Sequence, residues 1–164
     1  MVIVSRRRES TEHNIKSLEG EELSLKVFDQ LKWKSMRIMK EGAGKELNLT
    51  GIKEFLRGFD EKRLVLNLLE KLNKEGFLLP DFIVIKEDEI IFIEHKDTEK
   101  LKRSKSPQKQ ATQELVKNGF PCALMNTPKM FVEKVNKKSD DRELIEVPTN
   151  NSNKAYYFEL LYFP

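Results

Sequence analysis

Two apolar, β-rich runs separated by four charged residues are the feature of this sequence that most constrains its fold. The runs cover residues 78–85 and 90–93, with the charged residues 86–89 between them. Two such runs joined by a short polar segment predict an antiparallel β-hairpin. Because both strands are apolar at consecutive positions, neither has a polar face. We therefore expect the hairpin to lie inside a sheet that is covered on both sides.

The sequence before the hairpin has mainly helical spacing. Apolar residues recur three and four positions apart from Glu21 onward, unevenly as far as Ile38. A second, regular apolar stripe precedes Gly76, which stands where a helix normally ends. The predicted helices cover residues 21–38, 51–58 and 61–75, with Thr50 and Asp60 as the caps of the last two.

The sequence after the hairpin returns to a mixed pattern. Pro107 is a favoured first helical residue, and Gly119 follows the apolar spacing as its stop. The aromatic C-terminal segment has high strand propensity. The predicted elements are a helix over 107–118, a strand over 120–125, a charged surface helix or loop over 129–142, and an edge strand over 156–163.

The length of 164 residues is typical of one domain. The pattern predicts a single α/β domain, in which a mixed sheet around the hairpin is flanked by the 61–75 and 107–118 helices. We divide the chain into a mainly helical part over 1–75, a core segment with the chemistry over 76–126, and a charged segment with a C-terminal edge strand over 127–164.

Composition excludes few function classes. The 30 basic and 27 acidic residues leave a net charge of +3, which does not identify a nucleic-acid-binding protein. Cys122 is the only cysteine, so we expect a core residue and no internal disulfide. No apolar run approaches the length of a membrane span, and the chain begins without the charge order of a signal peptide. We expect a soluble, intracellular protein.

The hairpin register brings two acids together. If the turn is centred between Glu87 and Asp88, then Asp81 lies opposite Glu94 on one face of the sheet. Opposed Cβ atoms are about 4.5–5.5 Å apart, and two carboxylates so close repel unless a proton or a divalent cation lies between them. Lys96, two residues beyond Glu94, projects from the same face.

This grouping suits the hydrolysis of phosphodiesters. Carboxylate oxygens are preferred ligands of Mg²⁺, which leaves coordination positions for water and phosphate. We expect Asp81 and Glu94 to bind Mg²⁺, with the backbone carbonyl of His95 as a further ligand, and Mn²⁺ to substitute. The side chain of His95 is expected on the opposite face. Lys96 would orient the attacking water or stabilise the developing charge.

These residues resemble a known family. Pro80-Asp81, followed by Glu94-His95-Lys96, is similar to the signature of the PD-(D/E)XK nuclease superfamily, an Asp on one strand and (D/E)-X-K on the next. Ser106-Pro107-Gln108, Leu115 and Gly119-Phe120 resemble the helix that follows the catalytic strand in virus-type replication–repair nucleases and Holliday-junction resolvases. The resemblance covers roughly residues 76–126.

The resemblance implies a restriction-endonuclease-like core and a Mg²⁺-dependent deoxyribonuclease. It implies a Gln at the start of the following helix, for which Gln108 is chosen and Gln110 is the second candidate. It also implies a Glu on the first helix, for which Glu22 is a candidate. The family's usual first strand has little room directly before Asp81, between it and Gly76. The resemblance makes double-stranded DNA the expected partner. Such nucleases frequently act as dimers, so a homodimer is one expected assembly. A viral or mobile-element protein that acts in the host cytoplasm would fit the resemblance.

A basic segment flanks the predicted site. Its functional interpretation is contact with DNA phosphates, and the alternative is a solvated loop. A non-catalytic DNA-binding protein on the same fold, and an interaction domain without affinity for nucleic acid, are the alternative functions. Exonuclease and endonuclease action both remain open. The residues predicted to contact DNA are Lys100, Lys102, Arg103, Lys105 and Lys109.

Overall fold

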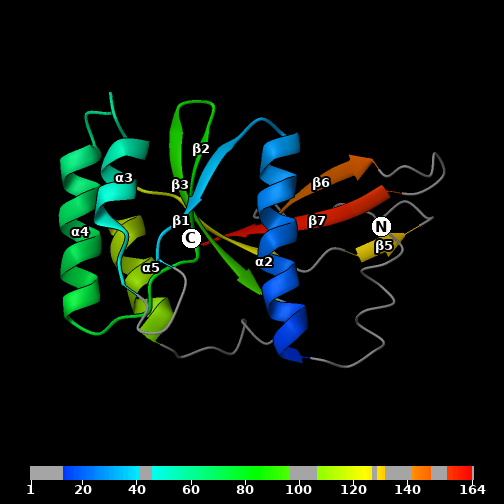
Figure 1. The fold of residues 1–164 in the computed structure, drawn as a ribbon, viewed down its shortest axis with the longest axis horizontal. Helices are drawn as coiled ribbons and strands as arrows, with labels where there is room; N and C mark the ends of the chain where they lie inside the picture. Colours follow the sequence, from blue (N-terminus) through cyan, green and yellow to red (C-terminus); the bar gives the residue numbers. More distant parts are fainter. Residues whose placement is uncertain are drawn as a thin grey trace.

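The computed structural model describes the backbone of residues 13–40, 46–96, 107–126, 129–131, 142–148 and 155–163. Side chains are described for residues 21–22, 24–40, 46–95, 110–125 and 160–163. Within these ranges the chain forms helices and one mixed β-sheet (Figure 1), which confirms the predicted α/β class.

The described helices are α2 (His13–Gln30), α3 (Leu49–Phe55), α4 (Lys62–Lys74) and α5 (Pro107–Lys117). The described strands are β1 (Lys34–Arg37), β2 (Phe82–Lys86), β3 (Glu89–Lys96), β4 (Cys122–Asn126), β5 (Lys129–Phe131), β6 (Arg142–Pro148) and β7 (Ala155–Tyr162). The sheet order is β1-β2-β3-β4-β7-β5, and β6 also pairs with β7. The β3–β4 pair is parallel, as a crossover through α5 requires, and the other pairs are antiparallel.

The predicted hairpin forms two interior strands of this sheet, β2 and β3, with the predicted register. Phe82 pairs with Ile93 and Lys86 with Glu89, so the turn is centred between Glu87 and Asp88. These two residues have φ angles of 50° and 64°, as a two-residue type I′ turn requires at both central positions.

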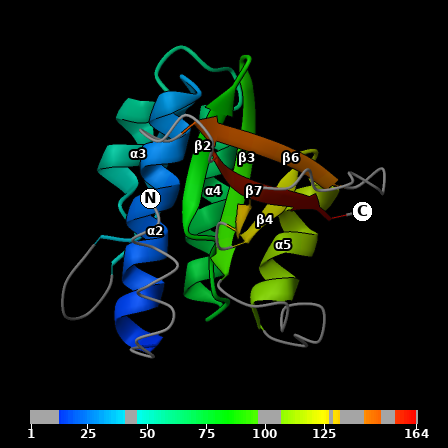
Figure 2. The same ribbon diagram turned by 90° about the vertical axis from the view of Figure 1, so that its right-hand side faces the viewer.

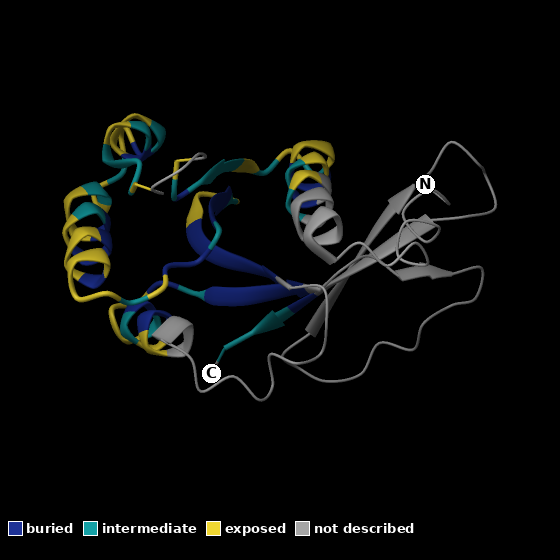
Figure 3. Cartoon of the chain, turned by 60° about the horizontal axis from the view of Figure 1, so that its bottom comes forward, coloured by how far each residue is buried: buried dark blue, intermediate teal, exposed yellow. Residues whose placement is uncertain are grey.

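Apolar residues on both faces of the hairpin enter separate parts of the core, and Figure 3 shows the strands at the centre of the sheet coloured as buried. Ile83, Ile85, Ile90 and Phe92 share one cluster with buried residues of α3, α4 and α5. The alternate residues of the same strands share the other with Val27 and Phe28 of α2. We name these sides of the sheet the α4–α5 face and the α2 face. The hairpin is covered on both sides, as predicted.

The helix pair predicted to flank the sheet lies on one face of it. The buried side chains Val65, Leu69 and Leu72 of α4 and Ala111 and Leu115 of α5 all belong to the cluster on the α4–α5 face. The α2 helix covers the opposite face, as Figures 1 and 2 show from two directions. The layers are therefore α2, sheet, and then α3, α4 and α5.

The predicted helix stops are confirmed and the predicted caps are not. Gly76 and Gly119 have φ angles of 84° and 92°, the left-handed conformation that ends a helix. The cap of α3 is Asn48, whose Oδ1 accepts a hydrogen bond from the N–H of Gly51 at 3.1 Å, so Thr50 lies inside the helix. The cap of α4 is Glu61, which makes no side-chain cap hydrogen bond.

The prediction of a helix over residues 21–38 is wrong in its second half. The α2 helix ends at Gln30, and the left-handed residue Lys32, with φ of 61°, redirects the chain into β1. This strand pairs with β2 from Lys34 opposite Ile85 to Arg37 opposite Phe82. Pairing with a strand about fifty residues away determines this segment, not its own spacing.

The C-terminal prediction is also wrong in part. The predicted edge strand is β7. It is not at an edge, because β6 pairs with residues 155–161 on one side while β4 and β5 pair on the other. Residues 129–131, predicted as surface helix or loop, form β5, and β6 was not predicted. Figure 2 shows β6 and β7 side by side.

No helix among the described residues is long and apolar enough to cross a membrane.

We predict that the double substitution Glu87→Asn and Asp88→Gly raises the free energy of unfolding by about 1 kcal/mol. Left-handed backbone costs an ordinary residue about 1–2 kcal/mol, and Asn-Gly is the preferred sequence of a type I′ turn. Thermal unfolding should show a midpoint higher by about 2–4 °C.

The matched control is Glu89→Gly, which removes a nearby acidic charge within β3, where no left-handed residue is required. This variant should lose stability, because glycine weakens a strand interior. Equal stabilisation by both substitutions would show that the gain comes from charge removal and not from the turn.

Candidate active site

The hairpin register extends to the two predicted metal ligands. Phe82 opposite Ile93 is the last pair of the β2–β3 ladder, and one further step places Asp81 opposite Glu94. Successive residues of a strand alternate between its faces. Asp81 and Glu94 therefore share the α4–α5 face with Ile83 and Phe92.

Asp81 is hydrogen-bonded to the chain on both of its sides, through its side chain and through its backbone carbonyl. Its Oδ2 accepts a hydrogen bond from the backbone N–H of His95 at 2.9 Å, and its carbonyl accepts one from the N–H of Ile38 at 3.0 Å. The side chain of Asp81 thus accepts an N–H of β3 just beyond the end of the ladder. The second carboxylate oxygen of Asp81 is then fixed at the end of the hairpin.

Glu94 lies deeper than Asp81. Its side chain is only 6% exposed, and its Cα lies opposite Leu124 of the neighbouring parallel strand β4. Burial of a carboxylate is costly unless cationic or hydrogen-bonding groups compensate for the lost water. A buried acid opposite a second, partly buried acid is therefore a site that favours a positive charge.

His95 contributes its backbone to this end of the hairpin. By strand alternation its side chain lies on the α2 face, with Ile91 and Ile93, as the sequence predicted. The side chain is 5% exposed, while its N–H meets Asp81. The carbonyl of His95 follows Glu94 directly and remains the predicted backbone ligand.

The other predicted site residues are described only in part. Lys96 is the last residue of β3 and its backbone is opposite Asn126 of β4. Gln108 and Lys109 are the second and third residues of α5. The side chains of all three lie outside the described residues, as do Lys100, Lys102, Arg103 and Lys105 entirely. Their predicted roles stay predictions.

Glu22, the candidate acid on the first helix, lies away from the carboxylates of Asp81 and Glu94. Glu22 is exposed on α2, and this helix covers the α2 face rather than the face of Asp81 and Glu94. The neighbouring Glu21 instead accepts a hydrogen bond from Arg37 Nη1 at 2.8 Å. Sequence reasoning missed this pair because Arg37 was expected inside a helix.

The side chains alone do not form a closed metal cage. Among the described residues there is no group of three or more His, Cys, Asp or Glu side chains arranged to hold a metal ion. The predicted set needs only two carboxylates and one backbone carbonyl, and Mg²⁺ is commonly bound through one or two carboxylates while it keeps several waters.

Comparisons of the chain with protein families, with curated proteins and with solved structures find no match.

Cys122 lies in the core, as predicted, and not in the candidate site. It is 2% exposed, and its Sγ contacts the carbonyl oxygens of Phe120 at 3.5 Å and Thr112 at 3.8 Å. Burial raises the pKa of the thiol from 9.0 to about 12. Since the thiolate is the reactive form, Cys122 is a poor nucleophile.

We predict that Cys122 reacts with a disulfide reagent only slowly in the native protein and rapidly in denaturant. The raised pKa also means that the folded protein holds the thiol proton more tightly than the unfolded chain. The stability that this provides is complete below pH 9 and is lost as the pH rises toward 12. Above pH 9 the free energy of unfolding should fall more steeply than in Cys122→Ala. Rapid labelling of the native protein at neutral pH would contradict the placement.

Proposed function

We propose that the protein is a metal-dependent nuclease that hydrolyses DNA phosphodiester bonds. The observation that carries this proposal is the register of the hairpin, which sets Asp81 opposite the buried Glu94 on one face of the sheet. Two carboxylates directly opposite one another repel unless a proton or a cation lies between them. A divalent cation would remove this repulsion, and hydrolysis of a phosphodiester is a reaction that such a cation serves.

The chemistry of the available donors fits Mg²⁺. Asp81 and Glu94 supply hard carboxylate oxygens, and His95 supplies a carbonyl oxygen from the residue between Glu94 and Lys96. The hydrogen bond from the His95 N–H restrains the Asp81 side chain before any cation binds. Less conformational entropy would therefore be lost when Asp81 becomes a metal ligand. Mn²⁺, which shares this preference for oxygen ligands, should also be accepted.

The order of elements along the chain supports the resemblance to the PD-(D/E)XK superfamily. The first helix α2 and the first strand β1 are followed, after α3 and α4, by β2, which begins directly after Asp81. Next come β3, which carries Glu94-His95-Lys96, the helix α5 and the strand β4. The sequence leaves little room for a first strand between Gly76 and Asp81. The first strand, β1, lies earlier in the chain, before the helices α3 and α4. These two helices are then an insertion between β1 and β2.

In the proposed mechanism each residue has a separate role. Asp81 and Glu94 would hold the cation, which when bound would act as a Lewis acid toward water and the scissile phosphate. Lys96 would hold the attacking water by donating a hydrogen bond from its ammonium group, or stabilise charge on the phosphate oxygens. The basic residues 100–109 would contact the flanking phosphates of the DNA.

The helical period favours Gln108 over Gln110 as the supporting amide. Gln108 occupies the position one turn before Ala111 and Thr112, both of which are buried under α5. Gln110 is exposed. Gln108 is therefore at the start of the side of α5 that covers the α4–α5 face.

We predict that Glu94→Gln abolishes Mg²⁺-dependent cleavage of duplex DNA. The loss should exceed about 100-fold, the upper range for removing a group that only supports a metal ligand. Wild type and variant would be compared on linear and circular DNA with Mg²⁺, with Mn²⁺ and with EDTA. The pair of substrates also separates cutting at ends from cutting within the chain.

The matched control is Glu89→Gln, which removes an acid from the same strand at its exposed, opposite end. This variant should cleave like the wild type. Full activity of Glu94→Gln would contradict the assignment. Salt-sensitive DNA binding by a wild-type protein that never cleaves would instead support a non-catalytic DNA-binding protein.

A further inference from the structure

The open edge of β1 is the starting point for a second site. Among the described strands β1 pairs only with β2. The N–H of Ile38 donates to Asp81 on the β2 side, so Met36 and Lys34, two and four residues earlier, also direct their backbone groups toward β2. Ser35, between them, directs its N–H and carbonyl away from the sheet.

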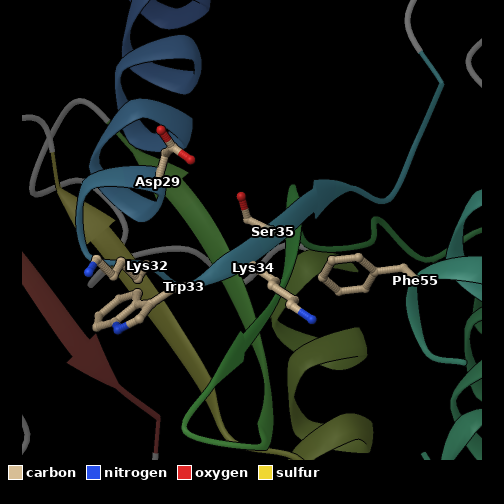
Figure 4. A pocket seen from close by; sticks show the side chains of 6 residues that line it. All are labelled: Asp29, Lys32, Trp33, Lys34, Ser35 and Phe55. Atoms are coloured by element: carbon tan, nitrogen blue, oxygen red, sulfur yellow. The ribbon is translucent and has the colours of Figure 1, made fainter. Parts of the chain in front are cut away.

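A hollow of about 560 Å³ lies along this edge. It is bounded by the last turn of α2, by the start of β1 and by α3 (Figure 4). The residues that line it are Asp29, Lys32, Trp33, Lys34, Ser35 and Phe55.

The two sides of the hollow differ in chemistry. Lys34 lies opposite Ile85 and thus on the α4–α5 face, where Figure 4 shows its side chain extended toward Phe55 of α3. Ser35 lies opposite Val84 on the α2 face, and its hydroxyl points to the same side as Asp29. An incoming strand would meet Lys34 and the ring of Phe55 on the α4–α5 side. On the other side it would meet Asp29, the hydroxyl of Ser35 and the ring of Trp33, which packs on the α2 face.

We propose that the edge of β1 binds an extended peptide segment, which adds to the sheet as a further strand and carries an acidic side chain opposite Lys34. Backbone hydrogen bonds to Ser35 would provide affinity, and the alternating side chains would provide specificity. The residue opposite Ser35 would be small or basic, because it lies on the side of Asp29. The residue opposite Met36 would be apolar, because Met36 packs against the core cluster of the α4–α5 face.

A second copy of the chain fits this edge less well than a peptide with an acidic residue. Antiparallel pairing sets residues with outward backbone groups opposite one another, so two β1 strands would pair symmetrically about Ser35 or about Met36. These registers set Met36 or Ile38 of the other copy opposite Lys34, and neither supplies an acidic partner for its ammonium group.

Nucleic acid also fits the hollow poorly. The ring of Trp33 already has two partners, Phe28 stacked at 6.1 Å and Lys86 with its Nζ 4.9 Å from the ring centre. Stacking on a base would have to displace one of them.

Trp33 makes the proposal directly measurable, because it is the only tryptophan of the chain and it lines the hollow. The full chain would be titrated with capped peptides of about eight residues, rich in Val and Thr, that carry Glu, Ala or Lys at one central position. The Glu peptide should change the Trp33 fluorescence saturably. The Lys peptide should bind about fivefold more weakly, as expected when one exposed ion pair is replaced by repulsion.

Two substitutions at Ser35 separate strand addition from other contacts. Ser35→Pro removes the outward N–H without removing a β1–β2 hydrogen bond, since proline is tolerated in an edge strand whose N–H faces solvent. It should weaken binding by at least about tenfold, through the lost hydrogen bond and the added ring. Ser35→Ala keeps the N–H and should bind like the wild type.

Lys34→Glu provides a test that does not depend on proline, and it should reverse the preference from the Glu peptide to the Lys peptide. Any of three results would overturn the proposal: no saturable binding of any peptide at millimolar concentration, equal binding by Ser35→Pro and Ser35→Ala in folded protein, or an unchanged preference in Lys34→Glu. Displacement of the peptide by a single-stranded oligonucleotide, or by dimerisation of the chain, would identify a different occupant and overturn it as well.

Discussion

The two-residue turn at Glu87 and Asp88 determines the register on which the candidate site depends. A slip of one residue would move every side chain of one strand to the opposite face, and Asp81 and Glu94 would then no longer share a face. Because both strands are apolar on both faces, their hydrophobic pattern alone does not distinguish the two registers. The two left-handed turn residues do. The register in turn sets Asp81 opposite Glu94, and the Asp81–His95 hydrogen bond closes the ladder at that point.

The same constraint explains which features the sequence predicted well. The hairpin, its turn and the opposition of Asp81 and Glu94 depend on interactions between residues at most 14 positions apart, and two consecutive apolar runs with a short polar turn define such interactions locally. The stops of α4 and α5 were likewise predictable, because Gly76 and Gly119 adopt a backbone conformation that glycine favours. The side of the sheet on which each acid lies followed from counting residues along the strands.

Features that depend on distant partners could not be predicted in this way. Residues 34–37, Lys-Ser-Met-Arg, have little strand propensity and become β1 only because β2 offers an edge across the inserted helices α3 and α4. The interior position of β7 depends on β6, whose residues gave no clear strand pattern. The Glu21–Arg37 pair joins two elements whose relation follows from that same pairing. The hollow beside β1 was equally beyond the sequence, since its walls come from three separate elements.

The most direct test of the proposed metal site is the line broadening that Mn²⁺ causes in the backbone amide signals of the protein. The acidic turn at residues 87–89 is an internal comparison, because it also presents carboxylates, but exposed ones at the other end of the hairpin. The account predicts selective broadening around Asp81 and Glu94 at low Mn²⁺ concentration, competition by Mg²⁺, and loss of the effect in Glu94→Gln. Equal broadening at residues 87–89, or an effect that Glu94→Gln leaves unchanged, would contradict a metal site at the end of the hairpin.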